Sequence, residues 1–234
     1  GVKVIIKPTT FKKDEILLTG FSRGGLSKIE KTNDLLSAMF AVHLITSSGI
    51  GNFTAIELEK YLAGKNVSVA PEINSFSEEL NGNSSVKDFE TMLQLVYLYF
   101  TAPRKDDEAI QAQMNIYKTV LANKESNPKA IFGDSIQMTM SNHHPRTILL
   151  NIDMLTKVDA DKALTIYKER FATPADFTFM LVGNIDPNDP ATKKLICTWI
   201  GGLKSKKVHE NFIDHGVRTP KGKVLNYFER EMQT

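Results

Sequence analysis

A stretch of six residues, Phe177–Val182, constrains the fold of this chain more than any other part of the sequence. Because side chains alternate along a β-strand, Phe179 and Leu181 lie on one face of this segment, and Met180 and Val182 lie on the other. Strands with large apolar residues on both faces are typical of the interior of a covered sheet. We therefore predict a central strand here that is buried on both sides.

The other predicted elements do not alternate strictly between strands and helices. We predict strands at 2–7, 15–21, 67–70, 75–81 and 177–182, the first two joined as a β-hairpin, and helices at 32–48, 55–63, 86–100, 106–123, 127–140, 160–171 and 188–200. Residues 81–85 read as a turn, and Thr54, Asp159, and either Asp186 or Asn188 read as helix caps. This order indicates an α+β fold, with helices packed on an antiparallel or mixed sheet.

Composition divides the chain near residue 205. Residues 1–205 are expected to fold as one domain, whereas the remaining stretch is rich in glycine and lysine and poor in large apolar groups. We read residues 206–234 as a linker and, at Lys223–Phe228, the first strand of a following domain that is missing. Both ends look cut, so we expect the sequence to be a segment of a longer protein.

Charge, cysteine content and hydropathy exclude several classes of function. The 29 basic and 27 acidic residues give a net charge of +2, which predicts no affinity for nucleic acid. A single cysteine, Cys197, excludes an internal disulfide and a multi-cysteine zinc site. The longest apolar run, Met92–Phe100, is far shorter than the roughly 20 residues of a membrane-spanning helix. We predict no membrane span.

The five histidines offer no metal site. A helical zinc site needs two histidines three or four residues apart and a nearby acid. His43 has neither, and we expect it to pack on a half-apolar helix face. The adjacent pair His143 and His144 precedes a proline in a loop, and His209 and His215 fall in the predicted linker, where solvated polar roles are expected.

No other side chains form a catalytic constellation. Cys197 lies among apolar neighbours and is expected to be a buried, inert thiol, and the Gly183–Asn188 turn has too few glycines for a phosphate loop. The aromatic run Tyr97–Phe100 favours core packing, and the paired acids Glu78 and Glu79 favour a solvated face. We therefore assign no catalytic residue and no metal ligand, and substrate-binding residues stay unknown.

Four segments resemble the insulinase/pitrilysin-type zinc metallopeptidases. They are Gly1–Ile16, Arg23–Ser27, Tyr167–Asp186 and His215–Gly222, and the third is the most specific. Together they span essentially the whole chain. The resemblance implies a mixed, largely antiparallel sheet with helices packed on it, in one of several homologous domains that pair around a chamber.

The same resemblance defines what is missing. The family's catalytic domain carries an inverted zinc motif, His-x-x-Glu-His, on the helix that corresponds to Thr32–Ser48, and this motif occurs nowhere in the 234 residues. The resemblance therefore implies a non-catalytic domain that helps to form the chamber and enclose substrate. It also implies zinc in the catalytic domain of the parent protein, and peptide substrate and sister domains as partners.

Two functions from different classes are compatible with this resemblance. The first is a structural, substrate-enclosing domain of a zinc metalloendopeptidase, in which this segment alone has no activity. The alternative is a scaffold or assembly domain of a non-peptidase relative. For localisation, the expectation is a periplasmic or otherwise exported bacterial protein. A third hypothesis, an independent domain that binds phosphate at the Gly183–Asn188 turn, has the weakest support.

Overall fold

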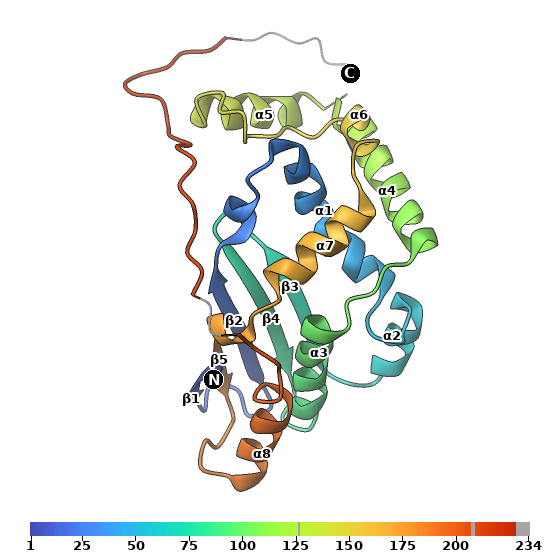
Figure 1. Cartoon of the computed structure of the whole chain (residues 1–234), viewed down its shortest axis with the longest axis vertical. Coiled ribbons are helices and arrows are strands. Elements are labelled where there is room, and N and C mark those ends of the chain that lie inside the picture. Colours follow the sequence, from blue (N-terminus) through green and yellow to red (C-terminus); the bar gives the residue numbers. More distant parts are fainter. Residues whose placement is uncertain (126, 207–208, 228–234) are drawn as a thin grey trace.

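The computed structural model describes residues 1–125, 127–206 and 209–227, coloured along the chain in Figure 1. Its elements in chain order are β1 (Lys3–Pro8), β2 (Ile16–Arg23), the 3₁₀ helix η1 (Gly25–Lys28), α1 (Thr32–Ser48), α2 (Ala55–Leu62), β3 (Val67–Ile73), β4 (Ser77–Ser84), α3 (Phe89–Thr101), α4 (Asp107–Glu125), α5 (Pro128–Met140), α6 (Ile152–Leu155), α7 (Ala160–Arg170), the 3₁₀ helix η2 (Pro174–Asp176), β5 (Thr178–Gly183) and α8 (Pro190–Trp199). Helix α6 has no counterpart among the predicted elements.

The strands form one five-stranded mixed sheet in the order β1-β5-β2-β4-β3. Only the β1–β5 pair is parallel, and the other three pairs are antiparallel. Helices lie against this sheet, as Figure 1 shows. The predicted α+β class, with a mixed and largely antiparallel sheet, is confirmed.

The predicted hairpin of the first two strands is wrong. Strand β5 lies between β1 and β2, pairing Ile5 with Met180 on one side and Thr19 with Met180 on the other. The long connection from residue 9 to 15 allows β1 and β2 to separate. Because β5 is flanked on both sides, all of its backbone groups within the ladder find partners, which an edge position would not provide.

Strand β5 is interior within the sheet, but it is buried on one face only. Phe179 and Leu181 are fully buried, whereas Met180 on the opposite face is 40% exposed. The prediction of burial on both sides was therefore wrong. The residues that pack on the sheet come from α1, α3 and α7, and they join the cluster on the Phe179 side.

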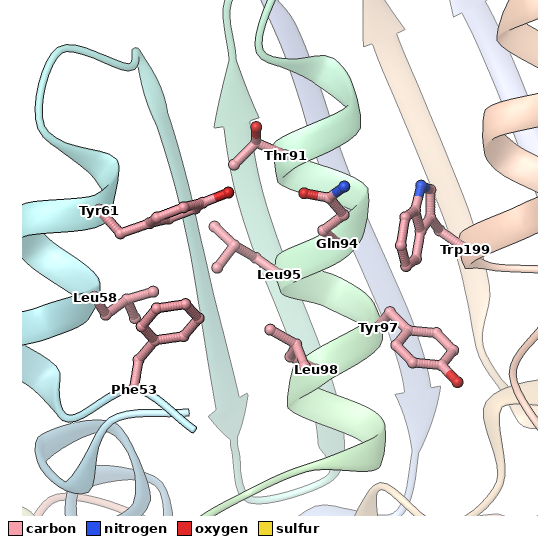
Figure 2. A pocket seen from close by; sticks show the side chains of 9 residues that line it. All are labelled: Phe53, Leu58, Tyr61, Thr91, Gln94, Leu95, Tyr97, Leu98 and Trp199. Carbon is pink, nitrogen blue, oxygen red and sulfur yellow. The ribbon is translucent and has the colours of Figure 1, made fainter. Parts of the chain in front are cut away.

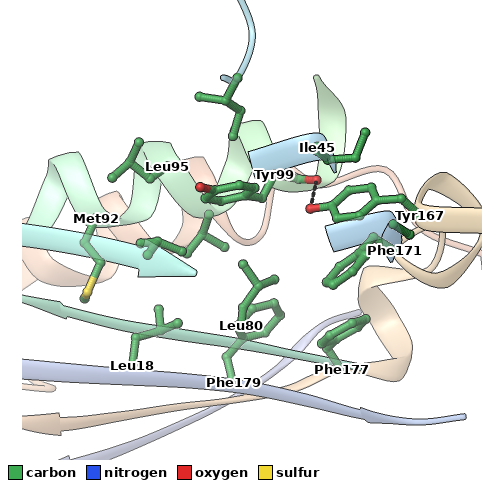
Figure 3. Close-up of a cluster of buried hydrophobic side chains, with 14 of the residues drawn as sticks. Leu18, Ile45, Leu80, Met92, Leu95, Tyr99, Tyr167, Phe171, Phe177 and Phe179 are labelled. Atoms are coloured by element: carbon green, nitrogen blue, oxygen red, sulfur yellow. Dashed lines mark hydrogen bonds between the residues drawn. The ribbon is translucent and has the colours of Figure 1, made fainter. Parts of the chain in front are cut away.

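The core lies between this covered face and the helices. Figure 3 shows Leu18, Leu80 and Phe179 of the sheet facing side chains of α3. A series of stacked rings runs from α7 into β5, with centroid separations of 4.6, 5.8 and 5.9 Å; its members, in order, are Tyr167, Phe171, Phe177 and Phe179. These rings fix α7 against β5, which are neighbours along the chain.

Residues 81–84 belong to β4 and do not form the predicted turn. Asn81 pairs with Thr19 of β2 and with Ala70 of β3, so this polar segment is held by ladders on both sides. A Cβ atom at Gly82 would lie 3.0 Å from the Ser68 carbonyl oxygen, so glycine suits the close approach of β3 here. Long-range pairing therefore outweighs the local turn propensity of asparagine and glycine.

Most of the helix starts agree with the expected caps. The Thr54 hydroxyl accepts from the Glu57 amide in a capping box, and Asp159 accepts from the Lys162 amide. The last helix is an exception, because Asp189 caps it and Pro190 is its first residue, rather than Asp186 or Asn188. Helix α1 also begins without a side-chain cap.

Candidate functional site

Helix α1 occupies the position where the resemblance places a zinc motif. Its only histidine, His43, is exposed, and its ring meets Tyr117 of α4 edge-on at 5.8 Å. The neighbouring Leu44 and Ile45 face the core. Within the described parts of the chain, no three histidine, cysteine or acidic side chains are grouped so that they could hold a metal ion.

Three other histidines, His144, His209 and His215, each interact with a different part of the chain. His144 accepts at Nδ1 from the Arg146 amide, in the turn after α5. His209 lies 3.0 Å from Asp176, and His215 donates from Nε2 to the Ser27 carbonyl oxygen at 2.7 Å. The His209 side chain is 95% exposed, in agreement with the predicted solvated role, whereas His215 is half-buried and bonded to the domain.

We expect the purified chain to bind no stoichiometric zinc, because a hydrolytic zinc site normally needs three protein ligands. Metal analysis after dialysis checks this, and the His43→Ala variant should give the same zinc content as the unmodified chain. One tightly held zinc per chain that is lost in His43→Ala would contradict the prediction.

The structure also bears on the expected buried thiol of Cys197 and on the hypothesis of phosphate binding at the Gly183–Asn188 turn. Cys197 is exposed rather than buried, because Ile196 and Ile200 face the core and leave Cys197 on the outer side of α8. In the Gly183–Asn188 turn, the Asn188 amide donates to the Asp186 carboxylate at 2.8 Å. This internal bond occupies an amide that a phosphate would need.

The most unusual buried polar group is Glu78, which is 1% exposed although the sequence predicted a solvated acid. Its Oε1 accepts from the Gly25 amide at 2.9 Å and from Arg170 Nη1 at 3.0 Å. The same Arg170 nitrogen lies 2.7 Å from Glu210. Burial raises the pKa of Glu78, and the hydrogen bonds from Gly25 and Arg170 only partly oppose this shift.

The Glu78–Arg170–Glu210 network joins segments that carried the sequence resemblance. Gly24 has a φ of +148°, and a Cβ atom there would lie 2.9 Å from the Glu78 carboxylate. At Gly25 the added Cβ would lie 2.2 Å from the Asn74 carbonyl oxygen. The Gly-Gly pair therefore makes room for the buried carboxylate, which is a packing role and not a catalytic one.

The segment after residue 208 is extended and bonded to the domain. The Glu210 amide donates to Asp176, and the Ile213 amide donates to the Ser27 hydroxyl. The domain boundary at 205 stays a prediction, but these bonds add an expected cost to removing residues 206–234. Residues 223–227 form no strand, and the last residue of the strand predicted there, Phe228, lies outside the described residues.

Truncation after Ser205 is expected to lower the melting temperature by about 2–8 °C. The loss of Glu210 and of the amide bonds costs about 1–2 kcal/mol, and each kcal/mol corresponds to about 2–4 °C in a domain of this size. Thermal melts followed by circular dichroism measure it. Truncation after Lys221, which keeps the bonded segment, is the matched control, and equal effects of the two truncations would contradict the prediction.

The face of the sheet opposite the core carries an apolar surface. Cross-strand register places Ile5 beside Met180, Leu17 beside Val182, and Phe21 beside Thr178. The largest of these side chains are between 39% and 43% exposed; they are Ile5, Leu17, Phe21 and Met180. We call this set the open sheet face.

A second apolar surface is a cleft of about 260 Å³ over the outer side of α3 (Figure 2). Phe53 and Tyr61 lie on one side of it, and Tyr97 and Trp199, edge-on at 5.7 Å, lie on the other. Tyr99 is buried as the sequence predicted, whereas Tyr97 lines this cleft. Among the described residues that line this cleft there is no histidine, cysteine, lysine or acidic side chain.

Comparison with known proteins gives two sequence relatives that are both described as zinc proteases. No family model matches the chain. A zinc protease PqqL-like protein of Arabidopsis thaliana is 30% identical over 206 residues, which are 87% of this chain and 18% of that protein. The probable zinc protease PqqL of Escherichia coli K12 is 22% identical over 205 residues, 87% of this chain and 22% of that protein. The chain thus spans about a fifth of the length of these relatives.

Solved structures share the fold. The periplasmic protease PqqL from Escherichia coli superposes with a TM-score of 0.71 at 21% identity, over 88% of this chain and 22% of that chain. The inactive domain of an M16 peptidase from Pseudomonas fluorescens gives a TM-score of 0.70 at 11% identity, over 91% and 51% of the two chains.

The chain has the α+β fold of these peptidase domains, and its sequence contains no His-x-x-Glu-His motif. Together with the two sequence relatives, this fold confirms the predicted resemblance to a non-catalytic domain of the insulinase/pitrilysin-type zinc metallopeptidases.

Proposed function

We propose that this chain is a structural, substrate-enclosing domain of a zinc metalloendopeptidase, which forms part of a chamber wall and supplies no catalytic group. The observation that carries the proposal is the open sheet face, where four large apolar side chains are partly exposed on neighbouring strands. Contiguous exposed apolar surface marks a region of contact with another protein or domain. Zinc and the reacting groups would then come from the catalytic domain of the parent protein, with peptides as substrates.

The charges around the open sheet face support contact with a sister domain. Lys3 and Lys7 lie on β1 at one edge, and Glu72 and Glu79 lie on β3 and β4 toward the other, on the same face by register. An apolar centre between oppositely charged margins defines both the affinity and the orientation of a packed neighbour. The relatives, which are about four to five times as long as this chain, have enough additional sequence for such neighbouring domains.

Complementation of activity tests this function. The parent polypeptide expressed without this segment should have little peptidase activity, and adding the separate 234-residue chain should restore it. Met180→Glu, on the open sheet face, should reduce the restored activity at least tenfold. Ile116→Glu places the same charge on an exposed residue of α4 and should leave restoration unchanged, since Ile116 is 56% exposed and lies away from this face.

Three outcomes would contradict the proposal: peptide hydrolysis by the chain alone, equal effects of the two substitutions, or no restoration. A parent without a His-x-x-Glu-His motif, in which the chain still binds the remaining polypeptide, would favour the alternative of a scaffold or assembly domain. No observation on this chain favours that alternative over the first function.

We also propose an exported, periplasmic location for the parent protein if it is bacterial. The support is the Escherichia coli relative, which is described as a periplasmic protease. Among the described residues, no helix has the length and apolar character needed to cross a membrane. Cell fractionation with an antibody to the chain tests the location.

A further inference from the structure

A pocket distinct from the open sheet face lies where β2 runs into η1. Its volume is about 320 Å³, within the range of about 300–1,000 Å³ that is common for ligand sites. Side chains from η1, α1, the β3–β4 turn and the loop after α5 form its walls, and the extended segment near Val217 closes one side. This pocket combines apolar walls with a few polar groups, unlike the almost wholly apolar cleft over α3.

Among the described residues that line this pocket, Arg146 is the one permanent cation, and it has a fixed orientation. Its Nη1 donates to the Ile29 carbonyl oxygen at 2.8 Å, and its Nη2 donates to the Leu26 carbonyl oxygen at 2.7 Å. None of the ion pairs within the described residues includes Arg146. The carbonyl groups orient the guanidinium but leave its charge unbalanced, and three of its five N–H groups are not used by these bonds.

The other acidic and polar groups of the pocket do not balance the positive charge of Arg146. Asp214 is already neutralised, because Arg218 donates to both of its carboxylate oxygens. The side chains of Gln137 and Thr147 also line the pocket, and neither has a hydrogen-bond partner within the described residues. The pocket therefore offers one positive charge together with neutral hydrogen-bonding groups, among them Gln137, Thr147 and Ser75, to a ligand.

Apolar side chains occupy the rest of the wall. The apolar residues that line the pocket are Leu26, Leu35, Met39, Phe76, Ile148 and Val217. Phe76 is 51% exposed and is held edge-on against Phe212 at 5.2 Å, so its ring presents a preformed surface. A ligand that satisfies both parts of the pocket needs one negative charge next to a short apolar group.

We propose that this pocket binds the free carboxylate end of a peptide whose last residue is apolar, such as leucine or phenylalanine. The carboxylate accepts from Arg146, since the planar guanidinium matches two carboxylate oxygens, and the side chain packs on Met39 and Phe76. A phosphate group, with its greater charge, would face only one unbalanced cation. This inference rests on the proposed function, because an enclosing domain meets peptides that end in carboxylates.

Fluorescence polarisation with the 234-residue chain tests the site. The probe is a labelled neutral pentapeptide ending in leucine, prepared with a free carboxylate or with a C-terminal amide. We expect the acid form to bind at least tenfold more tightly than the amide. Unlabelled octanoate, which has the same carboxylate and apolar chain but no peptide, serves as a competitor.

Three variants locate the binding. Arg146→Lys keeps the positive charge but loses the planar pair of N–H donors, and it should weaken binding of the carboxylate probe at least fivefold. Val217→Trp fills the pocket mouth and should abolish binding, while its melting temperature reports whether the fold persists. Arg23→Lys is the matched control, because Arg23 is exposed, does not line the pocket and should leave affinity unchanged.

Equal binding of acid and amide probes would overturn the proposal, as would equal effects of Arg146→Lys and Arg23→Lys. Binding of octanoate without binding of the peptide acid would also overturn it, since the peptide end is then not the ligand. Failure here leaves the complementation result intact, so the two proposals fail separately.

Discussion

Replacing Phe179 with alanine is expected to lower the free energy of unfolding by about 3–5 kcal/mol. Phe179 is fully buried in β5, where its ring packs over Gly20 of the neighbouring strand and ends the series of stacked rings that begins at Tyr167. Removal of the ring takes away apolar contacts and leaves a cavity that surrounding strands and helices can fill only in part. Urea unfolding followed by circular dichroism measures the change.

Met180→Ala is the matched control for Phe179→Ala. Met180 is the next residue of the same strand but lies on the open sheet face and is 40% exposed. Its truncation removes only part of the transfer free energy and creates no enclosed cavity, so we expect a loss of about 1 kcal/mol. Losses of similar size for the two variants would show that the core does not lie on the Phe179 side.

The sequence predicted those features of the fold that depend on local patterns. The alternation in Phe177–Val182 identified β5, and Thr54 and Asp159 marked helix starts, because caps act within one turn of the chain. Strand partners were not predictable in the same way. Insertion of β5 between β1 and β2 joins residues about 175 positions apart, and no local pattern in the first hairpin-like segment encodes it.

The burial of Glu78 also could not be predicted from the local sequence. Glu78 stands next to Glu79, and two adjacent acids are typical of solvated surface. Its burial depends on Arg170, which is 92 residues away, and on space left by Gly24. Both partners lie in segments that carried the family resemblance, so the resemblance contained a signal for a packing network that composition alone did not. The resemblance itself was confirmed: its segments are distributed from residue 1 to residue 222, and the Arabidopsis thaliana relative matches 87% of the chain.

Arg170→Met is expected to lower the free energy of unfolding at pH 7 by about 3–5 kcal/mol, because it leaves the buried Glu78 carboxylate without its cation. The Glu78 side chain is 2% exposed and that of Arg170 is 10% exposed, so solvent screens the pair weakly. Urea unfolding at pH 7 measures the loss. Lys168→Met removes a positive charge from the exposed side of the same helix and should change stability by less than about 0.5 kcal/mol.

The effect of Arg170→Met should shrink at lower pH. Desolvation already raises the pKa of Glu78, and loss of the arginine removes an attraction that lowers it, so the pKa in the variant rises further. An acid with a raised native pKa holds its proton at pH values where the unfolded chain has released it, so the native state gains stability as the pH falls through that range. Measurements at pH 5 should therefore give a smaller difference between variant and unmodified chain than at pH 7.

The Glu78→Gln, Arg170→Met double variant carries no buried charge at this position, so it should recover stability at pH 7 and lose the pH dependence. A loss that is equal at both pH values would show that packing of the Arg170 chain, rather than the charge on Glu78, determines the cost.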